Sequence, residues 1–481
     1  MGRKARKDSS VCRRPPSVLT RTLLFSVLVF SRKSGRGALW HQPVCRPRRQ
    51  NYSVMDTPTH LFAAGSNGRG QLATGDSQDA HTFTSCRFAG RESSSTSPPG
   101  LAPAIISIVG GGNHTLALLS RPAVSSPERL EVWGCGDGAK GQLGPRYIAD
   151  SEGLGRDGHA VLSPLILPWE EQGLFGYTVS QVAACWETSF FVLTKAGHHD
   201  LLASMGGDDF GDLGVGSKKD IRAPFHIVDL SHIVGSTAQH VSITGITAGP
   251  HHAIVLLRAD DKQYIAGWGT ARHGQLGPLL APSGRALPFS PSPVAIDPPI
   301  DVQLDPILSV RAGNQHSIFL HASGCISALG SDAKGQLQGL RTARDVRAIG
   351  CTWNGSYLRT PLGLLSTGTN ARGQLGREDA SSKAAPLAAV RLPEEAHVLD
   401  FSCGSEHVLA MVESRGKTEV WGWGWNEHGN LGIGTLDDVN VPVRIWPPSD
   451  AEPEGVTGTA VSVWAGCGTS WIAVSNCDPN R

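Results

Sequence analysis

The sequence predicts an all-β fold, a seven-bladed β-propeller, from three observations. A glycine turn recurs seven times, and each copy follows a short apolar stretch. A second element, in which a small-residue segment leads into an alternating apolar strand, lies between successive turns. Glycine accounts for 58 of 481 residues, well above the usual share of about 7%, which favours tight turns and short strands. Seven units of about four strands fit a propeller, because no such unit buries its faces alone.

The repeated turn carries one glycine at its start and a second five positions later. The seven copies are GSNGRGQL (Gly65–Leu72), GDGAKGQLG (Gly136–Gly144), GGDDFGDLG (Gly206–Gly214), GTARHGQLG (Gly269–Gly277), GSDAKGQLQ (Gly330–Gln338), GTNARGQLG (Gly368–Gly376) and GWNEHGNLG (Gly424–Gly432). Because both glycines keep their places in every copy, we expect positive φ angles there, or close approaches between blades that a Cβ would block. The turns are 38 to 71 residues apart, so the extra residues must fall in loops.

The second element is clearest in VGGGNHTLAL, ITAGPHHAIVL, VRAGNQHSIFL and FSCGSEHVLAM. One of its positions is often histidine, and across the units it reads His114, Thr188, His252, His316, Gly355, His407 and Thr469. None of these histidines has a partner at metal-ligand spacing. We therefore expect a structural hydrogen bond within each blade in place of catalysis or metal binding.

Together, the GxxxxGQLG turn and the AGxxHT-like element resemble the regulator of chromosome condensation repeat, over about residues 60–475. The resemblance implies a seven-bladed propeller whose repeats are staggered against its blades. The chain begins with a first-half element, Leu61–Thr74, and ends with a second-half element, Val463–Val474. We therefore expect these two elements to share one blade and to close the ring.

The sequence divides into a basic leader, residues 1–54, and the propeller, residues 55–481. The leader holds thirteen Lys and Arg against the single acid Asp8, a net charge of +12, whereas the remainder carries −11. Its apolar run Thr22–Ser31 is too short to span a membrane, which takes about 20 residues. The leader fits a mitochondrial presequence or a secretory signal, and it is an upstream extension of the reading frame if translation starts at Met55.

Composition and motifs exclude several classes of function. The acidic body does not favour direct binding to nucleic acid or anionic membranes. The ten cysteines form no CxxC pair, which indicates reduced, buried thiols and no metal site. No GxxxxGK[ST] phosphate loop and no nucleophile with a base stands out, and GGGNHT lacks the loop's lysine. We expect no catalytic residue and no cofactor, and hence a protein that is not an enzyme.

Three functions remain open: a protein-binding adaptor, an exchange factor for a small GTPase, and a chromatin protein that uses its basic leader. The apolar run in the leader is wrong for a disordered DNA-binding arm. Exchange on a small GTPase is what the resemblance implies from the family's best-known member. No additional hairpin between blades is evident as a wedge for such exchange, although the insert from Pro145 to Tyr177 is long enough to hold one.

The stretch GWGWNEHG also resembles the last-repeat motif of a narrower branch, the alpha-tubulin suppressor proteins of fungi and the secretion-regulating exchange-factor-like proteins of animals. For the fungal branch the resemblance implies a cytoplasmic and nuclear partner of a small CSL-type zinc-finger protein. We expect the propeller itself to be monomeric. That partner is an electron carrier in diphthamide synthesis and in wobble-uridine modification of tRNA. Guanine nucleotide exchange on a small GTPase stays the alternative, and a mitochondrial location follows if the leader is a presequence.

Candidate binding residues are those that deviate from the repeat. Trp425 occupies a slot that is otherwise small or polar: Ser66, Asp137, Gly207, Thr270, Ser331 and Thr369. Trp423 and Trp421 occupy mostly apolar strand slots, so we expect them to pack in the interior. The other candidates lie at turn or pre-strand positions that should reach a face: Glu427, His428, Asp209, Phe210, Trp186, Glu187, Trp353 and Asn354. Aromatic side chains on such a rim are frequent binding anchors.

Overall fold

The computed structural model describes residues 59–90, 104–121, 129–145, 147, 159–167, 169–216, 225–235, 238–378, 385–448 and 458–475. The leader, residues 1–54, and Met55 lie outside these described residues. Within the described ranges, no helix is long and apolar enough to cross a membrane.

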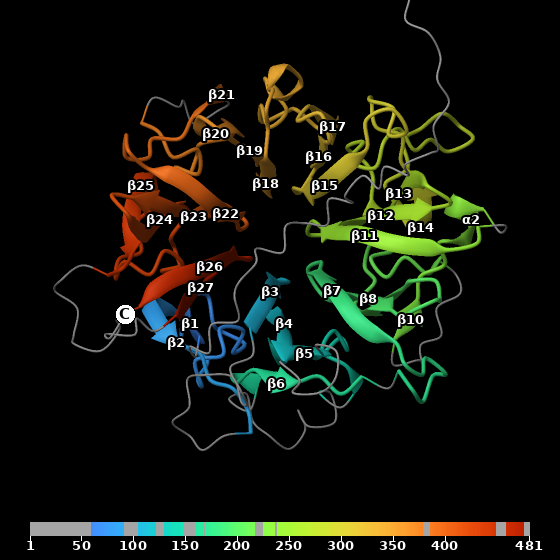
Figure 1. Ribbon diagram of the computed structural model, residues 1–481, viewed down its shortest axis with the longest axis horizontal. Helices are drawn as coiled ribbons and strands as arrows, with labels where there is room; N and C mark the ends of the chain where they lie inside the picture. Colours follow the sequence, from blue (N-terminus) through green and yellow to red (C-terminus); the bar gives the residue numbers. More distant parts are fainter. Residues whose placement is uncertain are drawn as a thin grey trace, which may run out of the picture. The chain divides into compact units, whose positions relative to one another are not determined.

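The described residues form seven antiparallel sheets, which we number as blades 1 to 7 (Figure 1). Blade 1 has the order β2 (Ala80–Ser85), β1 (Thr59–Gly65), β27 (Thr469–Ser475), β26 (Thr459–Ala465). Blade 2 is β3 (Ala104–Gly110), β4 (His114–Arg121), β5 (Arg129–Gly136), β6 (Ser163–Pro164). Blade 3 is β7 (Thr178–Ala184), β8 (Thr188–Thr194), β9 (Leu201–Gly206), β10 (His226–Ile227), and it is followed by the short helix α2 (Ser231–Val234).

The remaining blades follow in chain order. Blade 4 is β11 (Val241–Ala248), β12 (His252–Ala259), β13 (Lys262–Thr270), β14 (Phe289–Ala295). Blade 5 is β15 (Ile307–Ala312), β16 (His316–His321), β17 (Ile326–Gly330), followed by the 3-10 helix η3 (Leu340–Thr342). Blade 6 is β18 (Ala348–Thr352), β19 (Gly355–Thr360), β20 (Gly363–Gly368), β21 (Ala385–Ala389). Blade 7 is β22 (His397–Cys403), β23 (His407–Ser414), β24 (Lys417–Gly424), β25 (Val439–Trp446).

The predicted seven-bladed propeller is confirmed. The first strands of successive blades contact one another around a closed circuit, β3, β7, β11, β15, β18, β22, β26 and back to β3, and they line the centre of the ring in Figure 1. Blade 5 departs from the expected four strands, because its sheet has three and η3 lies against β17. This is also the unit with the shortest spacing between turns, so little chain is left for an outer strand.

The predicted closure of the ring is confirmed as well. β1, from the start of the propeller, pairs with β27, from its end, over the whole register from Thr59↔Ser475 to Gly65↔Thr469. Residues remote in sequence therefore complete one sheet, and the ring is held shut by backbone hydrogen bonds.

The core is distributed between the blades. There are seven clusters of buried apolar residues in the described ranges, and each one joins neighbouring blades. For example, Tyr357 and Leu364 of blade 6 pack with Trp423 and Val408 of blade 7. The prediction that Trp423 is a core residue is confirmed, since it is fully buried. Each blade thus depends on both neighbours for its burial.

The repeated turn glycines have the conformation that the repeat predicted. Both glycines of all seven copies have positive φ angles. At Gly65, with φ of 115°, a Cβ would also collide with the carbonyl oxygen of Gly468 in the same blade. Only glycine satisfies both conditions at once.

The repeated histidines are buried and structural, but the expectation of a bond within each blade is wrong. The Nε2 atom of each of the four is hydrogen-bonded to a serine hydroxyl of the next blade, at 3.0 to 3.3 Å: His114 with Ser189, His252 with Ser317, His316 with Ser356 and His407 with Ser470. Three of these serines donate onward to a glutamine carbonyl of the preceding turn, for example Ser356 to Gln336 at 2.7 Å. The histidines therefore join neighbouring blades.

Candidate functional site

Two sets of turns open on the same face of the propeller. The inner turn joins the first strand of a blade to the second, and the outer turn begins where the third strand ends. These ends lie side by side, because the first residue of each second strand pairs with the last residue of the third, as in His252↔Gly269 and His407↔Gly424. All the predicted site residues lie in these turns: Trp186, Glu187, Trp353 and Asn354 in inner turns, and Asp209, Phe210, Trp425, Glu427 and His428 in outer turns.

Backbone hydrogen bonds link the inner turns around the axis of the ring. They run from Gly112 N to Trp186 O at 2.8 Å, Trp186 N to Pro250 O at 2.8 Å, Asn314 N to Trp353 O at 3.0 Å, Trp353 N to Ser405 O at 2.7 Å and Ser405 N to Gly466 O at 3.1 Å. Both tryptophan backbones are thus fixed on each side by another blade. The two indole side chains are therefore attached to backbone segments that hydrogen bonds already hold in place.

Trp186 and Trp353 meet across the axis. Their ring centroids are 6.2 Å apart with the planes inclined at 44°, although blades 3 and 6 are not neighbours. The Trp186 ring is 6.5 Å from His251, in the inner turn of blade 4, and His251 is 4.7 Å from Phe210. Phe210 is 40% exposed, and both tryptophans are partly exposed. We call Trp186, Trp353, Phe210 and His251 the axial patch.

A buried carboxylate, that of Asp212, lies beside His251. His251 Nδ1 is 3.1 Å from Asp212 Oδ2, and the Asp212 side chain is only 4% exposed. Its other oxygen, Oδ1, has no hydrogen-bond partner in the described part of the chain. Burial raises the pKa of Asp212 above its ordinary value, and the contact with His251 opposes that rise.

Glu187 and Asp209 add negative charge at the axial patch. Gly207 N donates to the Glu187 carbonyl at 2.8 Å, and the Glu187 carboxylate lies over Gly207, where a Cβ would be 3.2 Å from Oε2. Asp209 is exposed at the tip of the same outer turn. The predicted pairs Trp186 with Glu187 and Asp209 with Phe210 are therefore brought together in blade 3.

The three predicted residues of the last turn form a second group, which we call the rim patch: Trp425, Glu427 and His428. Trp425 is partly exposed, donates from Nε1 to Glu427 Oε2 at 3.1 Å, and stands edge-on to His428 with centroids 5.4 Å apart. His428 Nδ1 is 2.7 Å from Asp79 Oδ2 of blade 1, and Glu427 is 4.0 Å from Arg372 of blade 6. The rim patch thus spans three blades.

The inner turn of blade 7 connects the two patches. Trp353 N donates to Ser405 O, and Trp425 N donates to Glu406 O at 2.9 Å. Burial raises the pKa of the Glu406 carboxyl, while a hydrogen bond from Asn354 and the charge of Arg372 oppose that rise. Backbone hydrogen bonds to this turn therefore link Trp353 of the axial patch with Trp425 of the rim patch.

Four residues of this surface were not predicted: His251, Asp212, Arg372 and Asp79. Asp212 carried a signal in the sequence, since six turns have an amide there, Gln71, Gln142, Gln275, Gln336, Gln374 and Asn430. His251 directly precedes His252, which belongs to the repeated histidine position, and nothing in the repeat pattern distinguished His251 as a separate candidate. Arg372 fits the repeat pattern, and only the fold brings it to Glu427.

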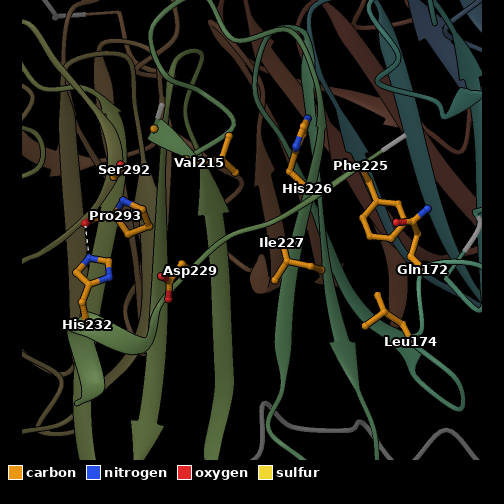
Figure 2. A pocket seen from close by; sticks show the side chains of 12 residues that line it. Gln172, Leu174, Val215, Phe225, His226, Ile227, Asp229, His232, Ser292 and Pro293 are labelled. Atoms are coloured by element: carbon orange, nitrogen blue, oxygen red, sulfur yellow. Dashed lines mark hydrogen bonds between the residues drawn. The ribbon is translucent and has the colours of Figure 1, made fainter. Parts of the chain in front are cut away.

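One cavity lies elsewhere, at the outer edge between blades 3 and 4 (Figure 2). It measures about 460 Å³ and is lined by Phe225, Ile227, Asp229, His232 and Pro293, among others. His232 Nε2 donates to the Pro293 carbonyl at 2.9 Å, as the dashed line in Figure 2 shows. No candidate residue lines this cavity. In the described ranges, no group of three His, Cys, Asp or Glu side chains could hold a metal ion.

The described part of the long insert folds back on the propeller. Trp169 packs edge-on against Phe225, with centroids 4.5 Å apart, and against Phe191 at 5.9 Å. Residues 148–158 of this insert lie outside the described residues. Six described residues of the insert pack against the cluster between blades 2 and 3, namely Tyr147, Leu165, Leu167, Trp169, Leu174 and Tyr177. Leu162 belongs to the cluster between blades 1 and 2.

Comparison with known proteins agrees with the repeat pattern. The family model "Regulator of chromosome condensation (RCC1) repeat" matches residues 363–411 and 418–471. The chain is 28% identical over 429 residues to the secretion-regulating guanine nucleotide exchange factor of Mus musculus, covering 81% of this chain and 79% of that protein. It is 26% identical over 426 residues to an ultraviolet-B receptor of Arabidopsis thaliana, covering 85% and 82%. The mouse relative is consistent with the branch that the last turn predicted.

Solved structures share the fold. Prp20p from Saccharomyces cerevisiae aligns with a TM-score of 0.64 at 19% identity, covering 88% of this chain and 93% of Prp20p. Human WBSCR16 aligns with a TM-score of 0.61 at 20% identity, covering 87% and 99%. At these identities the likeness establishes the propeller architecture alone.

Proposed function

We propose that this chain, which belongs to the regulator of chromosome condensation repeat proteins, is a protein-binding propeller without an active site of its own. Its partner docks on the face that carries the axial and rim patches. The observation that supports this proposal is the gathering of four partly exposed aromatic side chains on that single face: Trp186, Trp353, Phe210 and Trp425. Fold alone names no partner, so the argument rests on these side chains.

The surface has the physical properties of a binding site. Aromatic side chains bury a large apolar area at a small cost in conformational entropy, and they dominate the binding free energy of many interfaces. The backbone on both sides of Trp186 and Trp353 is fixed by hydrogen bonds to other blades. A partner therefore meets side chains on an ordered frame, which reduces the entropy lost on binding.

The partner proposed is a small CSL-type zinc-finger protein, an electron carrier in diphthamide synthesis and tRNA wobble-uridine modification. The support is the motif that distinguishes the last turn. Trp423 of that motif is buried, whereas Trp425, Glu427 and His428 reach the surface and contact residues of two other blades. The part of the motif that departs from the repeat is therefore available to a partner.

Two measurements test this proposal. Tagged full-length chain is purified from cells and its bound proteins are identified by mass spectrometry, and the purified chain is titrated with a CSL-type zinc-finger protein by calorimetry. We expect a saturable one-to-one complex with the zinc-finger protein. Recovery of a nucleotide-free small GTPase, with no heat on titration of the zinc-finger protein, would overturn the assignment.

The alternative is guanine nucleotide exchange on a small GTPase. The mouse relative is itself named as a guanine nucleotide exchange factor, and Prp20p, which shares the fold, has binding properties toward Gsp1p and histones. Release of a fluorescent GDP analogue from candidate GTPases distinguishes the two functions. Accelerated release of the GDP analogue by catalytic amounts of the chain would support the exchange function. A release rate equal to the spontaneous rate would exclude exchange on the GTPases tested.

We further propose a cytoplasmic and nuclear location. Mitochondrial import is the alternative if residues 1–54 are translated and act as a presequence. Sequencing the N-terminus of the endogenous protein decides between them, since a start near Met55 would leave no presequence.

A further inference from the structure

The inner turns have a one-sided distribution of charge. Their residues are Gly111–Asn113, Cys185–Glu187, Gly249–His251, Gly313–Gln315, Trp353–Asn354, Gly404–Glu406 and Gly466–Gly468. Among them there is no Lys and no Arg, whereas Glu187 and Glu406 are acidic. The inner turns therefore contribute two carboxylates and no Lys or Arg, although the exposed Arg311, next to last in β15, lies near Cys351 and Cys403 at the ends of inner strands. The chain outside the leader has a net charge of −11.

Blade 3 strengthens this charge. In the outer turns, the position before the second glycine is basic in six copies: Arg69, Lys140, His273, Lys334, Arg372 and His428. Blade 3 alone has an aromatic residue there, Phe210, and it has Asp208, Asp209 and Asp212 around it. The turn next to Trp186 therefore lacks the cation of its siblings and carries carboxylates instead.

The tryptophan pair has no repeat-wide structural role. The position of Trp186 and Trp353 is occupied in the other blades by Gly112, Pro250, Asn314, Ser405 and Cys467, all smaller side chains. The inner turns of these five blades occupy equivalent places around the axis without an indole. The fold therefore does not require a tryptophan at this position. The two indoles are nevertheless placed within 6.2 Å of each other at the axis, and both stay partly exposed.

Indole rings next to carboxylates attract a cation. The face of an indole binds an ammonium or guanidinium group, and a guanidinium also stacks on it as a plane. Carboxylates at the edge of such a site add charge attraction and speed encounter with a basic partner. The same carboxylates repel phosphate, which argues against a nucleic acid at this place.

We propose that the axial patch binds a basic segment of the partner protein, with an arginine or lysine side chain over Trp186 and Trp353 and with Glu187 and Asp209 beside its charge. This inference rests on the proposed protein-binding role but not on the identity of the partner. It assigns the axial patch to charge recognition and leaves the rim patch for further contacts.

The test uses full-length chain and labelled nine-residue peptides, followed by fluorescence anisotropy at physiological ionic strength. One peptide alternates glycine and arginine, the second alternates glycine and glutamate, and the third probe is a single-stranded oligonucleotide. We expect binding of the arginine peptide alone. Equal binding of both peptides, no binding of the arginine peptide, or binding of the oligonucleotide in its place would overturn the proposal.

Variants locate the binding. The double variant Trp186→Ala/Trp353→Ala should weaken arginine-peptide binding at least tenfold, and Glu187→Gln/Asp209→Asn should weaken it severalfold and reduce its dependence on salt. The second variant changes only turn carboxylates, so it keeps the test valid if the first fails to fold. Unchanged affinity in the carboxylate variant, or in a folded tryptophan variant, would contradict the proposal.

Matched controls lie in the loop before β7, at the opposite ends of the strands. Phe175 is 62% exposed there, and Glu170 and Glu171 are exposed beside it. Two control variants, Phe175→Ala and Glu170→Gln/Glu171→Gln, should bind the arginine peptide within twofold of the unchanged chain. A loss of affinity as large as that of the axial variants would indicate non-specific attraction and would overturn the proposal. Failure of peptide binding with capture of the zinc-finger protein intact would refute this inference and leave the proposed function standing.

Discussion

The indole rings of Trp186 and Trp353 meet over the propeller axis with centroids 6.2 Å apart, although they come from blades that do not touch through their inner strands. The backbone of each residue is held by inner-turn hydrogen bonds to both neighbouring blades, so the separation of the two rings depends on the blades between them. A binding surface at this point therefore requires a closed ring.

Removal of the Trp425 side chain should weaken partner binding and leave the fold intact. Trp425→Ala deletes a partly exposed ring whose indole N–H donates to the exposed Glu427, so we expect the free energy of unfolding to change by less than about 1 kcal/mol. Partner affinity should fall at least about tenfold. Calorimetric titration and thermal melting measure the two effects.

Trp421→Ala is the matched control for Trp425→Ala. Its indole makes the same kind of bond, to Glu419 at 3.0 Å, but it lies beside Arg415 of the hairpin at the other ends of the strands. Partner affinity should stay unchanged in this variant. The reverse pattern, with stability lost and binding kept in Trp425→Ala, would make Trp425 a packing residue.

Alanine at Gly65 should destabilise the ring, whereas alanine at Gly68 in the same turn should not. Gly65 has φ of 115° and a Cβ there would collide with Gly468 O, while a Cβ on Gly68 would meet nothing within 4 Å. Backbone strain alone costs about 1–3 kcal/mol, and the collision adds to it. Urea unfolding measures the difference, and equal stability of the two variants would argue against the positional role of Gly65.

Loss of one serine between blades should cost about 1–3 kcal/mol of stability. Ser356 accepts from His316 at 3.1 Å and donates to Gln336 O at 2.7 Å, so Ser356→Ala leaves two buried polar groups unpaired. Ser283→Ala, at an exposed position, is the control. Unfolding curves that coincide for the two variants would show that the link between blades adds nothing to stability.

Acid should destabilise the propeller through its buried histidines. Burial lowers the pKa of His316 and of His407 from 6.5 to about 4, so each stays neutral in the fold but takes up a proton in the unfolded chain below pH 6.5. The unfolded state then binds more protons, and stability falls as pH decreases from 6.5 toward 4, by up to about 1.4 kcal/mol per pH unit for each histidine.

The variant His316→Gln isolates this effect. This variant lacks one titrating group. The slope of its free energy of unfolding against pH should therefore be smaller, between pH 6 and 5, by about the contribution of one bound proton. Burial raises the pKa of Asp212, Asp400 and Glu406, which acts in the opposite direction in both proteins and cancels in the difference. Identical slopes would exclude His316 as a source of acid sensitivity.

Deletion of the last strands should open the ring. A chain that ends before Val463 lacks β27 and the last part of β26, from Val463 to Ala465, so β1 loses its partner from Thr59 to Gly65. We expect a broad, non-cooperative melt and rapid proteolysis. Supplying residues 458–481 as a separate fragment should restore cooperative unfolding, and full thermal stability of the truncated chain by itself would refute the role of this closure.

Much of the architecture could be predicted from the sequence, because the same strand and turn occur seven times and can be compared position by position. Gly65 and its counterparts could be recognised as obligatory, since a position that stays glycine in every copy has a backbone reason. Trp423 could be separated from Trp425 in the same way, because one occupies an apolar strand slot and the other a polar turn slot. Asp212 was also within reach, as the sole acid in a slot of amides.

Other features depend on which blade lies next to which. The bond of His316 to Ser356 was expected inside one blade, but a histidine at the start of a second strand reaches across to the following sheet. Likewise, nothing local in CWETS or CTWNGS indicates that Trp186 and Trp353 are near each other.

The sequence by itself determined the repeat, the number of blades, the closure of the ring and the residues that depart from the pattern. The reason is that turn geometry and the alternation of buried and exposed strand residues depend on residues adjacent in the chain. Only the tertiary structure decided that Trp186, His251 and Phe210 share a surface with Trp353, and that His428 meets Asp79. The physical reason is that ring closure brings together side chains from separate blades, and their distances depend on the packing of all seven interfaces at once.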